Sequence, residues 1–263
     1  MSRKVFIVGA KRSPIGSFLG ALKDVHPQDM GSQVLKTLLE ETKVPVDKID
    51  EVIVGNILSA GLGQGIARQI SVKAGIPEAV PAYSLNMLCG SGMKAILNAF
   101  MGIQSGLSEI VVAGGVESMS FAPYLVSGKV RSGNKMGNME MVDHMVYDAL
   151  TDAFGNMHMG ITAENIANKH NLSREEQDKF AYESQVKAIK AVDSGKFKDE
   201  IVPIVIKTRK GDIVFDTDEY PNRTTTPEIL AKLRPAFVKD GTVTAGNASG
   251  INDAASFTII ASE

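Results

Sequence analysis

Apolar and polar positions alternate along the chain in a pattern that predicts strands separated by helices. Apolar runs predict strands at 5–10, 52–55, 82–87, 109–115 and 254–261. Between them, apolar residues recur at helical spacing, which predicts helices at 30–42, 66–74 and 91–104. This alternation favours an α/β fold with a mostly parallel five-stranded sheet flanked by helices.

The same pattern predicts which segments are buried. The run 5–10 is expected to be a central strand and the run 82–87 a buried one. The core stripe of the helix at 30–42 is predicted to be Val34, Leu35, Leu38 and Leu39. The core positions of the helix at 91–104 are predicted to be Met93, Ile96, Leu97, Phe100 and Ile103.

After residue 120 the alternation of strands and helices is lost. Residues 121–243 are polar, methionine-rich and irregular. We therefore predict a core domain formed by residues 1–120 and 244–263, with a loop domain of 121–243 inserted before the last strand. In the loop domain, the capping box Ser173–Glu176 predicts the start of a helix that ends near Gly195. A small hairpin or edge strands are predicted at 201–206 and 212–215.

Composition limits the possible functions. The chain has 263 residues and a formal net charge of −2, so bulk attraction to nucleic acid or anionic membranes is not implied. No apolar run approaches the roughly 20 residues that cross a bilayer, and the N-terminus lacks a signal-peptide pattern. A single cysteine excludes an internal disulfide and is typical of a reducing compartment. We expect a cytoplasmic protein.

That single cysteine, Cys89, is the candidate catalytic residue. It lies where the predicted strand turns into the helix at 91–104, and Gly90 and Gly92 permit a tight turn there. A helix N-terminus favours an anion, and the thiolate is the nucleophilic form of cysteine. A lone cysteine is also often a small buried hydrophobe. The residues alone leave these two interpretations open.

Six segments, in order, are similar to thiolases, the coenzyme A-dependent acyltransferases, and the likeness runs from end to end. They are 5–16, 86–95 around Cys89, 114–120, 158–165, 232–237 and 242–253. The chain most resembles the biosynthetic, acetyl-CoA acetyltransferase type of this family. The resemblance implies the N-terminal half of a thiolase-like fold together with its loop domain.

The resemblance also implies a chemistry. Cys89 matches the nucleophile that takes an acyl group from acetyl-CoA as a thioester. A second acetyl-CoA, deprotonated at carbon, then attacks that thioester in a Claisen condensation, and the reverse reaction is thiolysis of acetoacetyl-CoA. Coenzyme A is a substrate here, and neither a cofactor nor a metal is expected. A homo-oligomer, dimer or tetramer, is expected.

Further substrate-binding residues are implied by the same likeness. They are Leu150, His158, Met159, Arg223, Leu233, Phe237, Ala245, Ala248, Ser249, Gly250 and Ile251. The small residues Ala248, Ser249 and Gly250 suit a loop whose backbone approaches the pantetheine arm. The family often has an arginine for the adenosine diphosphate end at the position of Asn222, and Arg223 follows one place on. Without its matching neighbours, His158 would be interpreted as a core histidine.

The chain departs from the family in what it lacks. Thiolases have a second half with a Gly-His-Pro segment, whose histidine activates the nucleophile, and a Cys-x-Gly segment, whose cysteine moves the carbon-bound proton. Neither segment occurs in these residues, and Cys89 is the only cysteine. We therefore expect a truncated or split thiolase that, by itself, is inactive or nearly so in condensation. We also expect an uncovered apolar sheet face and edge.

Several features have two interpretations. Glu117 is either a general base or a structural acid bonded to local backbone. The glycine-rich stretch 61–65 is a phosphate loop or a subunit-contact turn, and the basic stretch 127–135 is a solvated loop or a contact between dimers. The remaining histidines are interpreted as loop, surface or helix residues without a functional role: His26, His144 and His170.

Two other functions remain as alternatives. The chain could be a non-catalytic module derived from a thiolase that binds coenzyme A or contacts a subunit. It could also belong to a related class of condensing enzymes that work on acyl carrier protein. The segments His158–Gly160 and Asn247–Gly250 argue against the second alternative.

Overall fold

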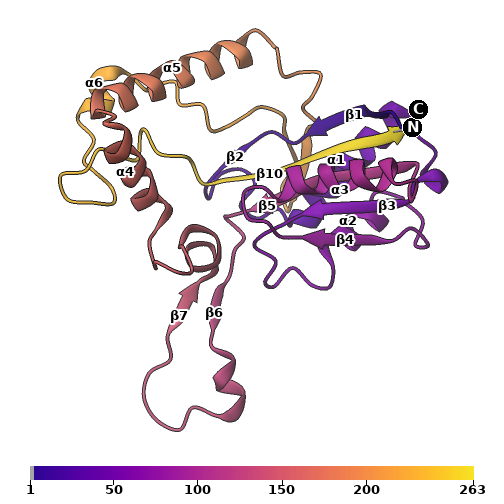
Figure 1. Ribbon diagram of the computed structural model, residues 1–263, viewed down its shortest axis with the longest axis horizontal. Coiled ribbons are helices and arrows are strands. Elements are labelled where there is room, and N and C mark those ends of the chain that lie inside the picture. The colour runs from indigo at the N-terminus through magenta and orange to yellow at the C-terminus, as the bar shows by residue number, and fades with distance from the viewer. Residues whose placement is uncertain (1–2) are drawn as a thin grey trace.

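A mixed sheet forms the centre of the computed structural model, which describes residues 3–263 (Figure 1). Its long strands follow the order β1-β10-β5-β3-β4, and the short β2 pairs with β10. The strands are β1 (Val5–Arg12), β2 (Gly16–Ser17), β3 (Glu51–Gly55), β4 (Ala82–Leu85), β5 (Ile110–Ser118) and β10 (Asn252–Ser262). β3 is parallel to β4 and β5, and β10 is antiparallel to both β5 and β1. Four of the five long strands therefore run one way, which confirms the mostly parallel sheet.

Helices cover both faces of this sheet. They are α1 (Pro27–Thr42), α2 (Ile66–Lys73) and α3 (Ser91–Gln104). Successive residues of β3 point to opposite faces. Val52 and Val54 pack in one core with α1 and α2, and Ile53 packs in a second core with α3. The α1 stripe of Val34, Leu35, Leu38 and Leu39 is buried as predicted.

The two edge strands of the sheet differ from the prediction that they are central or buried. β1 is an edge strand, because β10, from the far end of the sequence, inserts between β1 and β5. Its side chains are correspondingly exposed, with Ile7 at 62%. β4 forms the opposite edge, and Tyr83 and Ser84 are exposed rather than buried. A run of apolar residues predicts a strand, but its place in the sheet depends on a distant segment.

The outer side of α3 is also more exposed than predicted. The helix has the predicted bounds, but it packs on the sheet through small residues, Ala95 and Ala99, together with Ile103. Met93, Leu97 and Phe100, predicted to be core positions, are 71%, 48% and 44% exposed. Small residues bring α3 close to the sheet and turn its large apolar side chains outward. The expected uncovered edge is present at β1, but the expected uncovered face of the sheet is not, because helices cover both faces and the exposed apolar side chains lie on α3 instead.

Residues 119–251 contribute no strand to the main sheet. Their elements are β6 (Tyr124–Val126), η2 (Gly128–Ser132), β7 (Met141–Asp143), η3 (Met145–Leu150), α4 (Met159–His170), α5 (Arg174–Asp193), β8 (Ile204–Thr208), β9 (Gly211–Phe215) and α6 (Pro227–Ala231); one more short helix, η1 (Val46–Lys48), precedes β3. The capping box at the start of α5 and the β8–β9 hairpin are confirmed. Figure 1 shows the β6–β7 arm projecting away from the sheet.

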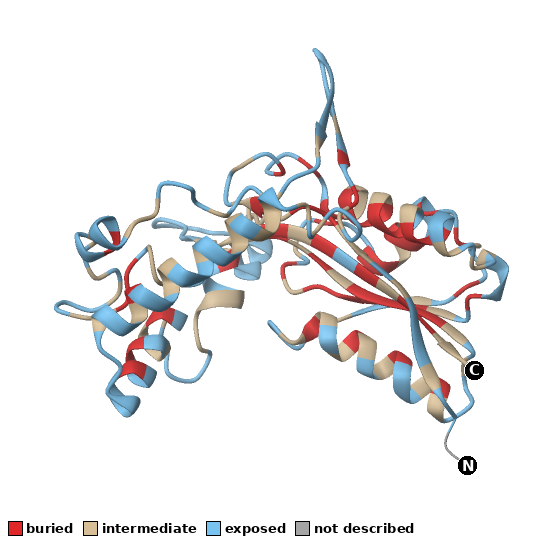
Figure 2. Cartoon of the chain, turned by 90° about the horizontal axis from the view of Figure 1, so that it is seen from above, coloured by how far each residue is buried: buried red, intermediate tan, exposed pale blue. Residues whose placement is uncertain are grey.

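This segment is nevertheless joined to the core. Val202 and Ile204 are buried in the cluster that contains α1. Figure 2 shows buried residues concentrated in the sheet and on the inner sides of its helices, while α5 is largely exposed. Within the described residues, no helix is long and apolar enough to cross a membrane.

Close packing between β5 and β10 yields a stability prediction. A Cβ atom added to Gly114 would lie 2.1 Å from the carbonyl oxygen of Ser256 and 2.8 Å from Cα of Phe257. Gly114→Ala should lower the free energy of unfolding by about 1–3 kcal/mol, because backbone must move to admit a methyl group. Thermal denaturation followed by circular dichroism measures the effect. Gly128→Ala, where no atom lies within 4 Å of the new Cβ, is the control. Equal midpoints for the two variants would contradict this packing.

Candidate active site

Cys89 lies on a tight turn between β4 and α3. Leu88 has a φ of +48°, in the left-handed region, and Gly90 is the N-cap of α3. The Ser91 hydroxyl donates to the Leu88 carbonyl oxygen at 2.6 Å and accepts from the Met87 N–H at 2.8 Å. These bonds fix the turn on either side of Cys89. The sulfur belongs to an exposed residue, so the interpretation as a buried hydrophobe is wrong.

An open cavity of about 310 Å³ adjoins this turn. Its lining comes from the ends of β3 and β5, the start of β10 and the first residues of α3: Gly55, Ile57, Leu88, Cys89, Ser91, Gly92, Gly115, Val116, Glu117, Ala254, Ala255 and Ser256. Carboxyl ends of parallel strands are common sites for ligands in α/β sheets. The thiol is therefore reachable from solvent through a cavity at such an edge.

Glycines allow α3 to begin directly against the strand ends. A Cβ on Gly55 would lie 2.5 Å from the Ser91 carbonyl carbon and 2.6 Å from the Gly92 nitrogen. A Cβ on Gly115 would lie 3.1 Å from the Gly55 oxygen and 3.5 Å from Cα of Gly92. Backbone therefore meets backbone at this point, and the position of Cys89 relative to the sheet is set there.

Of the residues that the structure describes, Glu117 is the one ionisable side chain besides Cys89 that lines this cavity. Its carboxylate accepts hydrogen bonds from the N–H groups of Ile57 and Leu58, at 2.8 and 3.0 Å, and from the Asn56 amide at 3.0 Å. Burial raises the pKa of Glu117, and the bonds from Ile57 and Leu58 partly oppose that rise. Because both oxygens are engaged with the 56–58 loop, the structure supports the structural interpretation of this residue.

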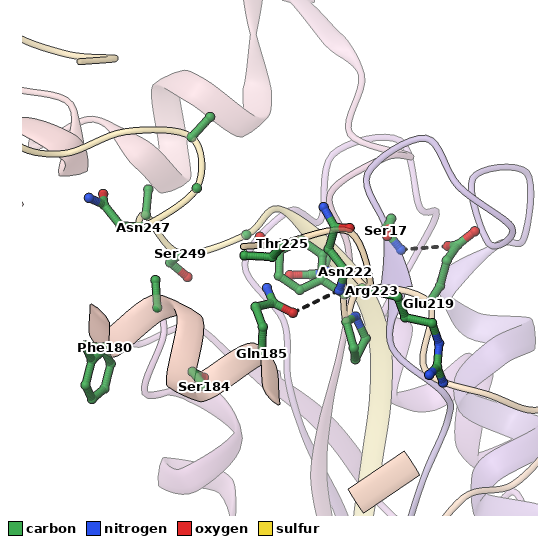
Figure 3. Close-up of a pocket in the computed structure, with 18 residues that line it drawn as sticks. Ser17, Phe180, Ser184, Gln185, Glu219, Asn222, Arg223, Thr225, Asn247 and Ser249 are labelled. Atoms are coloured by element: carbon green, nitrogen blue, oxygen red, sulfur yellow. Dashed lines mark hydrogen bonds between the residues drawn. The ribbon is translucent and has the colours of Figure 1, made fainter. Parts of the chain in front are cut away.

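A second, larger groove of about 1030 Å³ lies between α5, the segment 219–225 and the loop 245–250 (Figure 3). Five of the predicted substrate-binding residues line it: Arg223, Ala245, Ala248, Ser249 and Gly250. Sequence reasoning missed the lining residues Phe180, Gln185, Tyr220 and Thr225, which no motif marks. They meet only because α5 folds back beside the two loops.

The floor of this groove depends on a close contact at Gly250. A Cβ there would lie 2.3–2.6 Å from the ring and hydroxyl of Tyr220. Asn247 fixes the same loop, since its amide donates to Asp178 at 2.9 Å and its oxygen accepts from the Thr244 N–H at 2.7 Å. The small residues of the loop 245–250 therefore permit tight packing.

His158 and Phe237 are brought together outside this groove. The His158 ring stacks on Phe237, with centroids 5.0 Å apart, and its Nδ1 accepts from the Gly160 N–H at the N-terminus of α4. The other predicted residues line neither the groove nor the Cys89 cavity: Leu150 ends η3, Met159 begins α4, Leu233 lies beside Gly246, and Ile251 precedes β10.

Of the two interpretations of His144, as a surface or a helix residue, the structure supports the helix: it is the N-cap of η3 and only 6% exposed. Its Nδ1 bonds Asp148 at 2.5 Å, and the Ala60 N–H donates to its Nε2. His26 precedes α1 and packs on Phe121. His170 lies in the last turn of α4. Among residues 3–263, no group of His, Cys, Asp and Glu is suited to hold a metal ion.

β10 connects the two cavities. Asn252 lines the groove, and Ala254, two residues further along the strand, lines the Cys89 cavity. At about 3.3 Å per residue, that separation is roughly 7 Å along the strand.

Comparison with known proteins identifies the family. The profile described as "Thiolase, N-terminal domain" matches residues 5–263. The chain belongs to the thiolase family. Thiolase relatives named acetyl-CoA acetyltransferase, from Syntrophomonas wolfei and Pseudomonas aeruginosa, are 51% and 52% identical over 100% and 98% of this chain. The crystal structure of the Bacillus anthracis acetyl-CoA acetyltransferase matches with a TM-score of 0.96, at 44% identity and over the whole chain.

The match does not extend over the whole of these thiolases. The chain spans 66% of the length of the two relatives and 66% of the solved Bacillus anthracis chain.

The raised pKa of Glu117 predicts a pH dependence of stability. Between the ordinary value of 4.5 and the raised value, the folded chain holds a proton that the unfolded chain has released. The contribution of Glu117 to the free energy of unfolding therefore falls as pH rises above 4.5. Denaturant unfolding of the wild-type chain and of Glu117→Gln, across this range, isolates the effect.

Burial also raises the pKa of Glu51. Glu51 is present in both proteins, so its contribution cancels when the wild-type chain is compared with Glu117→Gln. The wild-type value minus the variant value should decline with rising pH. A difference that increases with pH would mean that the hydrogen bonds to Glu117 outweigh its burial.

Proposed function

We propose that Cys89 is the catalytic nucleophile of an acyltransferase and takes an acetyl group from acetyl-CoA. The observation that carries this proposal is the exposed thiol at the N-terminus of α3, beside a cavity, in a chain of the thiolase family. The full activity proposed is that of an acetyl-CoA C-acetyltransferase, with acetyl-CoA and acetoacetyl-CoA as substrates. The names of the relatives support that choice of acyl group.

The acylation step balances without any further reactant. The Cys89 thiolate attacks the thioester carbonyl carbon of acetyl-CoA, and the new carbon–sulfur bond replaces the bond to the coenzyme A sulfur. The coenzyme A thiolate leaves and takes up the proton released by Cys89. The N-terminus of α3 favours negative charge during this exchange, because its first N–H groups have no partner within the helix.

The groove is the proposed site for coenzyme A. We propose that the pantetheine arm lies along Ala248, Ser249 and Gly250 and passes β10 toward Cys89. The short spacing between Asn252 and Ala254 supports this path, since these residues line the two cavities in turn. His158, Met159, Phe237 and the other residues named from the family likeness are proposed to line it once a ligand is bound.

Condensation is proposed to need residues that this sequence does not contain. It has no Gly-His-Pro segment, and Cys89 is its only cysteine. Glu117, the other ionisable group of the cavity, is held by N–H donors. The second half of a thiolase would supply both segments. The division into a core and a loop domain, the homo-oligomer and the cytoplasmic location belong to the same proposal.

A second candidate is a module that binds coenzyme A or contacts a subunit without turnover. The uncovered apolar side chains of α3, Met93, Leu97 and Phe100, favour it. Exposed apolar patches of this kind mark interaction surfaces. Binding of coenzyme A without acylation of Cys89 would separate this candidate from the first.

The purified chain should be acetylated at Cys89. Incubation with acetyl-CoA, alone and with a thiolase C-terminal half, followed by peptide mass spectrometry, should show one two-carbon adduct, on the peptide that contains Cys89. Cys89→Ala is the control and should carry no thioester, because no other cysteine exists.

Two results would overturn parts of this proposal. An adduct on lysines only, unchanged in Cys89→Ala, would reject the nucleophile. Thiolysis of acetoacetyl-CoA by these residues alone, at the rate of a complete thiolase, would reject the need for the second half.

A further inference from the structure

The groove proposed to hold coenzyme A contains one cationic side chain, that of Arg223, within the described residues. Glu219 is the other charged residue of its lining, and its carboxylate accepts from the N–H groups of Ser17 and Ala21. The remaining lining residues are neutral. Coenzyme A carries several negative charges on its phosphates, so recognition of them in this groove depends on Arg223.

Arg223, however, is already engaged. Its Nη2 and Nη1 atoms lie 2.6 and 3.0 Å from the two carboxylate oxygens of Asp193. These two parallel hydrogen bonds use the same guanidinium N–H groups with which an arginine binds a phosphate. The hydrogen bond from Arg223 also lowers the pKa of Asp193, so the carboxylate stays charged. Figure 3 shows the Arg223 side chain directed away from the loop that carries Asn247 and Ser249.

The neighbouring position does not replace this cation. Asn222 uses its side-chain oxygen to accept from the N–H and hydroxyl of Thr224, at 2.9 and 2.8 Å. Its own N–H donates to Gln185 at 2.9 Å. Asn222 is therefore a turn residue and adds no positive charge to the groove.

We propose that Asp193 is a specificity-determining residue, which neutralises Arg223 and makes the groove select the pantetheine arm rather than the phosphates of its ligand. This inference rests on the proposed function, in which the groove binds coenzyme A. It predicts that the groove accepts acyl-pantetheine thioesters as a class, with the nucleotide end of coenzyme A contributing little to binding. Asp193 itself does not line the groove and acts through Arg223.

The ion pair between Arg223 and Asp193 can be broken without disturbing the fold. Both side chains are more than half exposed, at 58% and 55%, and exposed ion pairs contribute little to stability. Asp193 is the last residue of α5, where the helix dipole disfavours a carboxylate. Asp193→Asn should therefore fold normally and free the guanidinium of Arg223.

Calorimetric titration of the purified chain with coenzyme A and with pantetheine tests the inference. The wild-type chain should bind the two within about threefold of each other. Asp193→Asn should bind coenzyme A about two- to fivefold more tightly, with pantetheine unchanged, and the gain should shrink at high salt. Adding Arg223→Gln to Asp193→Asn should remove the gain. Glu183→Gln, which makes the same charge change on α5 without contacting Arg223, should show none.

The outcomes separate this inference from the function on which it rests. Equal gains for both ligands, or a gain that survives Arg223→Gln, would reject the role of Asp193 and leave the groove as the coenzyme A site. A wild-type chain that binds coenzyme A far more tightly than pantetheine would reject it as well. Failure of every variant to bind either ligand would reject the proposed site and this inference together.

Discussion

Contact between backbone atoms of β3, β5 and α3 is the constraint on which the rest of the structure depends. Gly55, Gly92 and Gly115 meet without side chains between them, so the first turn of α3 lies directly on the strand ends. That contact fixes where the turn before α3 can lie. It thereby sets the position of Cys89, whose turn is closed by the Ser91 hydroxyl. The burial of small residues along α3 follows from the same close approach.

The long insertion between β5 and β10 forms the groove that lies beside the Cys89 cavity. It brings α5 and the loop 245–250 together around a groove, and β10 then returns to the sheet between β1 and β5. The side chain of Arg12, at the end of β1, pairs with Asp218 at 2.6 and 2.9 Å and so ties the segment beside the groove to the core. The groove and the Cys89 cavity are consequently held at a fixed spacing along one strand.

Local patterns predicted much of this fold. The bounds of α3, the capping box of α5, the β8–β9 hairpin and the last strand follow from periodicity and turn chemistry, which act over short distances. The edge position of β1 could not be predicted this way, because it results from the insertion of β10. The burial of His144, as distinct from its place in a helix, could not be predicted for a similar reason, since it involves the loop at Ala60.

For the site, the sequence predicted the turn at Cys89 and the small-residue loop but not the residues that complete the groove. Phe180, Gln185 and Tyr220 carry no motif and become neighbours only through tertiary packing. Asp193, at the end of α5, carries no motif either. Its pairing with Arg223 joins residues 30 positions apart, a relation that spacing alone does not reveal.

The most direct test of this account is the rate at which acetyl-CoA acetylates Cys89 in Gly55→Ala. The new methyl group would overlap the Ser91 and Gly92 backbone and displace the turn. We predict that acetylation slows by about tenfold or more while the circular dichroism spectrum is retained, because a small displacement of a reacting atom is costly. Acetylation at the wild-type rate would contradict the claim that this backbone contact positions the thiol.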